Sequence, residues 1–110
     1  MATIQNITID QDADYTETLT IKDSTGSVVD LTGSTMTSKL RKTHLSSSAT
    51  SFTTAIVSAP AGTCSITLTD TVTSGLAEGG YVWDLTQTDS SGINTRRIEG
   101  RATVTPSVTR

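Results

Sequence analysis

This sequence of 110 residues has little of several residue types, and each shortage excludes a class of protein. A single cysteine, Cys64, excludes an intrachain disulfide, and its apolar neighbours at alternate positions indicate a small buried residue. A catalytic thiol would need a nearby base, and the sequence has one histidine, His44. No apolar run approaches the roughly 20 residues that span a bilayer.

Charge is also scarce, since charged residues make up 17% of the chain and the net charge is −3. Nucleic-acid binding requires a net basic face, and docking on anionic membranes requires basic clusters, so we expect neither as a partner. The segment Met1–Asn6 has neither the basic flank nor the apolar stretch of a secretory signal. We therefore expect a protein that is made in a cytoplasm and leaves it only on something larger.

Threonine is what the sequence has in abundance, with 24 Thr and 14 Ser. Threonine is β-branched and fits a pleated, half-exposed surface, so hydroxyl groups replace charge on the outer face. Segments rich in Ala, Leu, Glu and Lys are absent. The composition predicts an all-β protein.

Alternation of apolar and polar residues marks the strands, and turn residues separate them about every 8–12 positions. Tyr81, Trp83 and Leu85 share a face and carry the largest apolar surface of the chain. Asp70 and Gly75 suit the start and end of one short helical turn. The expected strands are residues 3–9, 15–22, 34–42, 52–58, 64–68, 81–88 and 93–105.

These features predict an immunoglobulin-like antiparallel β-sandwich of about seven strands, with at most one short helical turn. No predicted helix is long enough to cover a parallel sheet, which favours antiparallel pairing. We expect one domain over residues 1–106 and a tail over 107–110, after the strand-ending Pro106. Tyr81 stands where such domains place a tyrosine that bonds back to the preceding corner.

The sharpest candidate for a metal site is the alternating set Asp10, Asp12 and Asp14. An EF-hand loop would need Gly and Glu where this chain has Tyr15 and Ile21, so that motif is excluded. A looser calcium site and a solvated acidic turn both remain open. We assign no catalytic, cofactor-binding or metal residues, and expect a surface position for His44.

Six basic residues form two groups that would make one basic strip if their strands were neighbours. The strip reads as surface charge, or as partners for acidic groups on an adjoining subunit, because stacking aromatics are too few for nucleic acid. Glu17 is unusual because it shares a face with Leu19 and Ile21, so we expect solvent or an arginine beside it. The basic groups are Lys39, Arg41 and Lys42, then Arg96, Arg97 and Arg101.

Six segments of turn and strand residues follow one another in a recognisable order. They are Asp23–Gly26, Val29–Gly33, Gly62–Thr63, Leu68–Thr69, Leu76–Leu85 and Gly100–Arg110. This order resembles the immunoglobulin-like modules of tailed-bacteriophage structural proteins. It is most similar to the N-terminal module of baseplate upper proteins and to small virion proteins of cyanobacterial and marine phages. Those baseplate proteins continue into further domains, which we do not expect here.

The resemblance implies a non-enzymatic virion structural protein, made in the host bacterial cytoplasm and located in the virion. It implies docking onto other virion proteins, as a homo-oligomer or in several copies per particle, as a tail or baseplate adaptor or accessory subunit. The alternative is a capsid decoration protein on the head. A carbohydrate-binding sandwich would instead need exposed aromatics, Trp83 above all. We expect the N-terminal strand and Pro106–Arg110 to act as arms for strand exchange.

Overall fold

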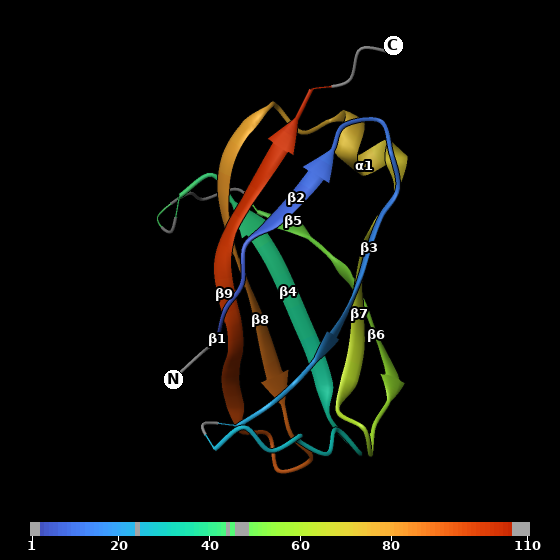
Figure 1. Ribbon diagram of the computed structural model, residues 1–110, viewed down its shortest axis with the longest axis vertical. Helices are drawn as coiled ribbons and strands as arrows, with labels where there is room; N and C mark the ends of the chain where they lie inside the picture. The colour runs from blue at the N-terminus through green and yellow to red at the C-terminus, as the bar shows by residue number, and fades with distance from the viewer. Residues whose placement is uncertain (1–2, 24, 44, 46–48, 107–110) are drawn as a thin grey trace.

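The computed structural model describes residues 3–23, 25–43, 45 and 49–106 (Figure 1). Two β-sheets pack face to face, and one short helix lies at an end of the molecule. The elements are β1 (Thr3–Ile4), β2 (Ile7–Asp10), β3 (Tyr15–Thr20), β4 (Thr35–Arg41), β5 (Thr50–Ser51), β6 (Thr53–Ser58), β7 (Thr63–Leu68), α1 (Asp70–Ser74), β8 (Gly79–Thr88) and β9 (Asn94–Thr105).

The larger sheet, sheet A, has the order β1-β9-β8-β4-β5, with β2 also on β9. The smaller sheet, sheet B, has the order β3-β7-β6. This division matches the immunoglobulin fold, in which the third, sixth and seventh strands (C, F and G) form one sheet and A, B, E and D the other. The predicted immunoglobulin-like all-β sandwich is therefore confirmed, with β3, β7 and β6 as strands B, E and D.

Most strand pairs are antiparallel, as predicted, and the N-terminal segment is the exception. Both β1 and β2 run parallel to β9, with Thr3 opposite Ile98 and Ile7 opposite Ala102. The remaining pairs of strands are antiparallel. The N-terminal segment is therefore held in sheet A.

Gln5 and Asn6 divide the predicted N-terminal strand into β1 and β2. Both residues form hydrogen bonds that depart from the regular ladder between this strand and β9. The Gln5 N–H donates to the Glu99 carbonyl at 2.8 Å, and the Gln5 carbonyl accepts the Trp83 indole N–H at 2.9 Å. Asn6 Oδ1 accepts the Arg101 backbone N–H at 3.1 Å. Gly100 permits this approach, since a Cβ there would collide with the Gln5 carbonyl oxygen.

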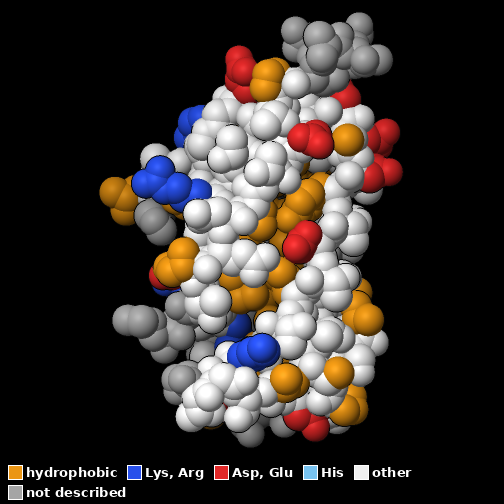
Figure 2. Space-filling view, in the orientation of Figure 1, with side chains coloured by type: hydrophobic (Ala, Val, Ile, Leu, Met, Phe, Trp, Pro, Cys, Tyr) orange, Lys and Arg blue, Asp and Glu red, His pale blue; other side chains and the backbone are white. Residues whose placement is uncertain are grey.

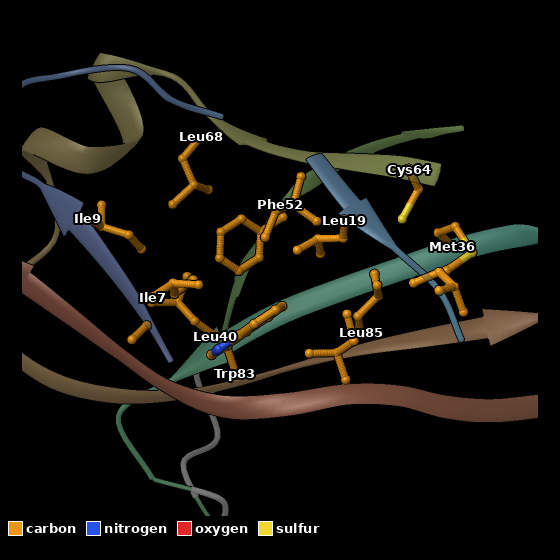
Figure 3. Packing of buried hydrophobic residues seen from close by; sticks show 14 of the residues in the cluster. Ile7, Ile9, Leu19, Met36, Leu40, Phe52, Cys64, Leu68, Trp83 and Leu85 are labelled. Carbon is orange, nitrogen blue, oxygen red and sulfur yellow. The ribbon is translucent and has the colours of Figure 1, made fainter. Parts of the chain in front are cut away.

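The core lies between the sheets, and Figure 3 shows its side chains pointing into that space. Phe52 stands near its centre, with ring centroids 6.1 Å from Trp83 and 6.3 Å from Tyr15. Trp83 is 3% exposed and Leu85 is fully buried, as predicted. The other predicted inward residues found buried are Ile7, Ile9, Leu19, Ile21, Met36, Ser38, Leu40, Cys64, Ile66, Leu68, Ile98, Ala102 and Val104.

Ile56 follows Phe52 at an alternating position of the chain, yet the two residues differ in burial. The chain passes from sheet A to sheet B between β5 and β6, and buried Phe52 stands at that crossing. Beyond it, β6 is an outer strand of sheet B, and its register with β7 shifts between Ile56 and Ser58. Ile56 is consequently 36% exposed, and Val57 is 61% exposed.

The corner between sheets B and A confirms two local predictions and corrects one. The helix α1 ends at Gly75, and the Tyr81 hydroxyl donates to the Ala77 carbonyl at 2.8 Å, which is the bond back to the corner. Asp70 does not cap the helix, because the N-cap residue is Thr69. Instead the Asp70 backbone N–H donates to Asp14 Oδ1 at 2.7 Å, so the loop between β2 and β3 caps the helix.

We expect Gly100→Ala to destabilise the fold by about 1–3 kcal/mol, because the new methyl group displaces Gln5 and weakens its bond to Trp83. Gly80→Ala is the matched control on the neighbouring strand, since a Cβ there meets no described atom within 4 Å. Thermal and urea unfolding measure both effects. Equal stability of the two variants would contradict the role assigned to Gly100.

Candidate functional site

The structure presents two surfaces suited to a partner, and the first is the outer edge of β3. This strand pairs with β7 along one edge only, from Tyr15 opposite Leu68 to Thr20 opposite Thr63. Among the described residues no strand pairs with its other edge. In immunoglobulin domains that place belongs to strand A, which this chain has moved onto β9.

The register shows which backbone groups face the open edge. The Ile21 N–H donates to the Gly62 carbonyl at 2.7 Å, so Ile21 belongs to a hydrogen-bonded pair. Such pairs alternate along an antiparallel ladder. The N–H and C=O groups of Thr16, Thr18 and Thr20 therefore point away from β7, and these three residues are exposed.

Glu17 lies on the inward side of this edge strand and is half-buried. Of the two surroundings expected for Glu17, solvent and an arginine, the structure shows solvent, since the side chain is partly exposed and the ion pairs of the described residues do not include it. Figure 2 shows hydrophobic side chains at the surface along the middle of the face between β2 and β3. An inward-pointing charge on an open edge discourages indiscriminate pairing. The edge therefore favours a strand that can accommodate a carboxylate.

Tyr15 begins the same strand and is half-buried against Phe52. Burial, and secondly the negative charge of Glu17, raise the pKa of Tyr15 to about 12. Its hydroxyl thus stays protonated over the whole neutral range. The Tyr15 ring places an apolar surface at the start of the open edge of β3.

The second surface is a groove on the outer face of sheet A, with a volume of about 1010 Å³. It runs across β4, β8 and β9, and Ile4 and Asn6 form one wall. Threonine hydroxyls and six charged side chains dominate its lining. The charged residues are Lys39, Arg41, Asp84, Arg96, Glu99 and Arg101.

Arg96 joins both acidic side chains of the groove. Its Nε lies 3.5 Å from Asp84 Oδ2, and its Nη1 lies 3.3 Å from Glu99 Oε2. Four cationic and two anionic side chains line the groove, an excess of two positive charges in a chain of net charge −3. The groove is therefore positive relative to the rest of the molecule.

The strands of the two basic groups are not direct neighbours, because β8 lies between β4 and β9, yet four of the six basic residues line the same groove and two do not. Arg97 Nε donates to Gln87 Oε1 at 2.8 Å, because the register of β8 and β9 shifts after Leu85 and turns this side chain away from the groove. Lys42 Nζ lies 4.7 Å from the centre of the Tyr81 ring. The shift in pairing could not be read from residue spacing.

The predicted alternatives for the aspartates resolve into separate structural roles. Asp10 Oδ1 accepts the Thr105 hydroxyl at 2.7 Å, Asp14 caps α1, and Asp12 has a left-handed backbone with φ of 64°. The described residues include no group of three His, Cys, Asp or Glu side chains placed to hold a metal ion. The calcium alternative thus has no support in the geometry.

The two remaining candidate residues differ in what the structure says of them. Cys64 is fully buried in the core, and this burial raises the pKa of its thiol. A thiol with a raised pKa stays protonated at neutral pH and is a poor nucleophile. His44 and the tail 107–110 lie outside the described residues.

No family model matches the chain, and no curated protein matches it. Among solved structures it is similar to an internalin-like protein of Listeria monocytogenes, at 14% identity and a TM-score of 0.46. That match covers 96% of this chain, which spans 28% of the internalin-like protein. In the described part of the chain, no helix has the length and hydropathy needed to cross a bilayer.

We expect Tyr15→Phe to remove a specific loss of stability at alkaline pH. The pKa of Tyr15 rises from 10.0 in the unfolded chain to about 12 in the fold, so the protonated ring stabilises the fold fully below pH 10. That contribution is lost as the pH rises towards 12, because the unfolded chain ionises first. Melting temperatures of both proteins across this range measure it, and parallel curves would contradict the assignment.

Proposed function

We propose that this protein is a non-enzymatic structural subunit of a bacteriophage virion, an adaptor or accessory subunit of the tail or baseplate. Its role is to dock onto other virion proteins. The observation that carries the docking role is the open edge of β3, which a partner strand can extend. The virion assignment itself derives from the resemblance of the segment order to phage modules.

The β3 edge specifies the chemistry of the strand that would occupy it. Main-chain groups of Thr16, Thr18 and Thr20 bind any extended backbone, each bond contributing about 0.5–1.5 kcal/mol. Selectivity comes from the inward positions, where Leu19 is buried and Glu17 is half-buried. The partner strand therefore alternates and carries an apolar residue beside Leu19 and a cation beside Glu17.

A modest contact of this kind is sufficient in a particle. In a symmetric tail or shell each small interface recurs many times, and linked contacts strengthen one another through high effective concentration. The exposed Thr-rich surface keeps single chains soluble before assembly. The buried Trp83 removes the aromatic platform that a carbohydrate-binding sandwich would need.

We expect Thr18→Pro to block docking while the domain still folds. Proline removes one edge N–H, and edge strands tolerate this loss because no internal bond is broken. The matched control Thr18→Ala keeps the N–H and loses only the side chain. Incorporation into phage particles, measured beside the thermal melting of each variant, tests the prediction.

The expected result is incorporation of the alanine variant and exclusion of the proline variant by about tenfold or more, the effect of ~1.4 kcal/mol. Full incorporation of a normally folded Thr18→Pro protein would contradict the docking role proposed for the β3 edge. Electron microscopy of the native particle tests the assignment itself. Density on the tail or baseplate supports it, density on the head favours the decoration alternative, and absence from the particle rejects both.

A further inference from the structure

Two regions of the molecule carry an excess of one charge, and the groove on sheet A is the positive one. The negative region, here called the acidic end, lies where the β2–β3 loop meets α1, at one end of the longest axis (Figures 1 and 2). Its five carboxylates are all exposed. They belong to Asp10, Asp12, Asp14, Asp70 and Glu78.

Hydrogen bonds fix the backbone and several side chains of the acidic end. Asp14 Oδ1 accepts the Asp70 backbone N–H, and the Thr73 hydroxyl donates to the Ala13 carbonyl at 2.9 Å. Asp10 is anchored to the Thr105 hydroxyl at 2.7 Å. The end therefore presents its charges in a fixed arrangement, so that little conformational entropy is lost when it binds.

We propose that the outer face of sheet A is an interface between copies of this chain, in which the acidic end of one copy occupies the groove of the next. The two regions have opposite charge, which gives the complementarity that steers proteins together. The groove is open and holds about 1010 Å³, which suits a protein segment such as the α1 turn. The inference rests on the proposed function, because it names a second copy as the partner of this face.

The geometry determines the kind of assembly. The acidic end and the groove are different surfaces, so the contact is head-to-tail and repeats in a ring or a row. A twofold dimer would instead use one self-complementary surface. The exposed ion pairs are individually weak and screened by salt, so the isolated chain should associate weakly and only at low ionic strength.

The test uses sedimentation velocity on the full chain and on two variants. The groove variant, Lys39→Glu with Arg101→Glu, changes the excess charge of the groove from two positive to two negative. The end variant, Asp70→Lys with Glu78→Lys, removes most of the charge of the acidic end. Lys22→Glu is the control, because Lys22 is exposed and lies outside both regions.

The unaltered chain should associate with rising concentration at ~0.01 M ionic strength, where the Debye length is ~30 Å, and dissociate at ~1 M. Each double variant alone should associate at least roughly tenfold more weakly, since repulsion replaces attraction in the groove variant and little attraction remains in the end variant. The Lys22→Glu protein should behave as the unaltered chain. Melting curves establish that all variants are folded.

The decisive measurement mixes the two double variants. The groove variant keeps a working acidic end and the end variant keeps a working groove, so together they should form a 1:1 complex and nothing larger. A mixture that stays monomeric overturns the proposal, as does an unaltered chain that is monomeric at low salt. A groove that binds an acidic peptide but no second copy also overturns it.

These outcomes are distinct from those of the proposed function. A chain that enters particles in a manner sensitive to Thr18→Pro, yet never self-associates, retains the docking role and loses this interface. A chain that self-associates through the groove, yet is absent from the particle, retains the interface and loses the virion assignment.

Discussion

The close contact between Gln5 and Gly100 is the constraint on which the rest of the structure depends. It brings the N-terminal segment onto β9, where the Gln5 carbonyl satisfies the indole N–H of Trp83. Burial of that ring would otherwise leave a polar group without a partner, which is costly in an apolar interior. Because the segment is used there, no strand of the described part of the chain lies beside the outer edge of β3. A single packing requirement of the core thus creates the surface to which we assign docking.

The scarcity of charge gives the few charged residues a clear distribution. Threonine and serine are frequent among the exposed residues, and their hydroxyls are compatible with solvent and with a partner backbone alike. Against this neutral background the groove of sheet A and the acidic end stand out. Glu17 has a third role, because its half-buried carboxylate lies on the inward side of the open β3 edge and restricts which strand can pair there. Docking by strand addition and association by charge therefore use different surfaces.

Several local features were predictable because they depend on neighbouring residues. Alternation placed Leu19, Leu40 and Leu85 in the core, and the corner bond of Tyr81 followed from its position before a strand. Features that depend on distant partners were not. Asp70 suits a helix cap by residue type, yet Asp14 from another segment supplies the cap. Ile56 fits the alternation and is still partly exposed, because β6 lies at the rim of the sandwich.

The sequence alone determined the fold class, the strands and the inward faces, because β-branched residues, period-two alternation and turn residues act over a few positions. The tertiary structure decided which edges are paired and which charges share a surface. Parallel pairing of β1 and β2 with β9 joins residues nearly a whole chain apart, and residue patterns contain no record of such a choice. The register shift that separates Arg97 from Arg96 likewise arises only when two strands meet. The open edge and the groove are both products of that long-range pairing.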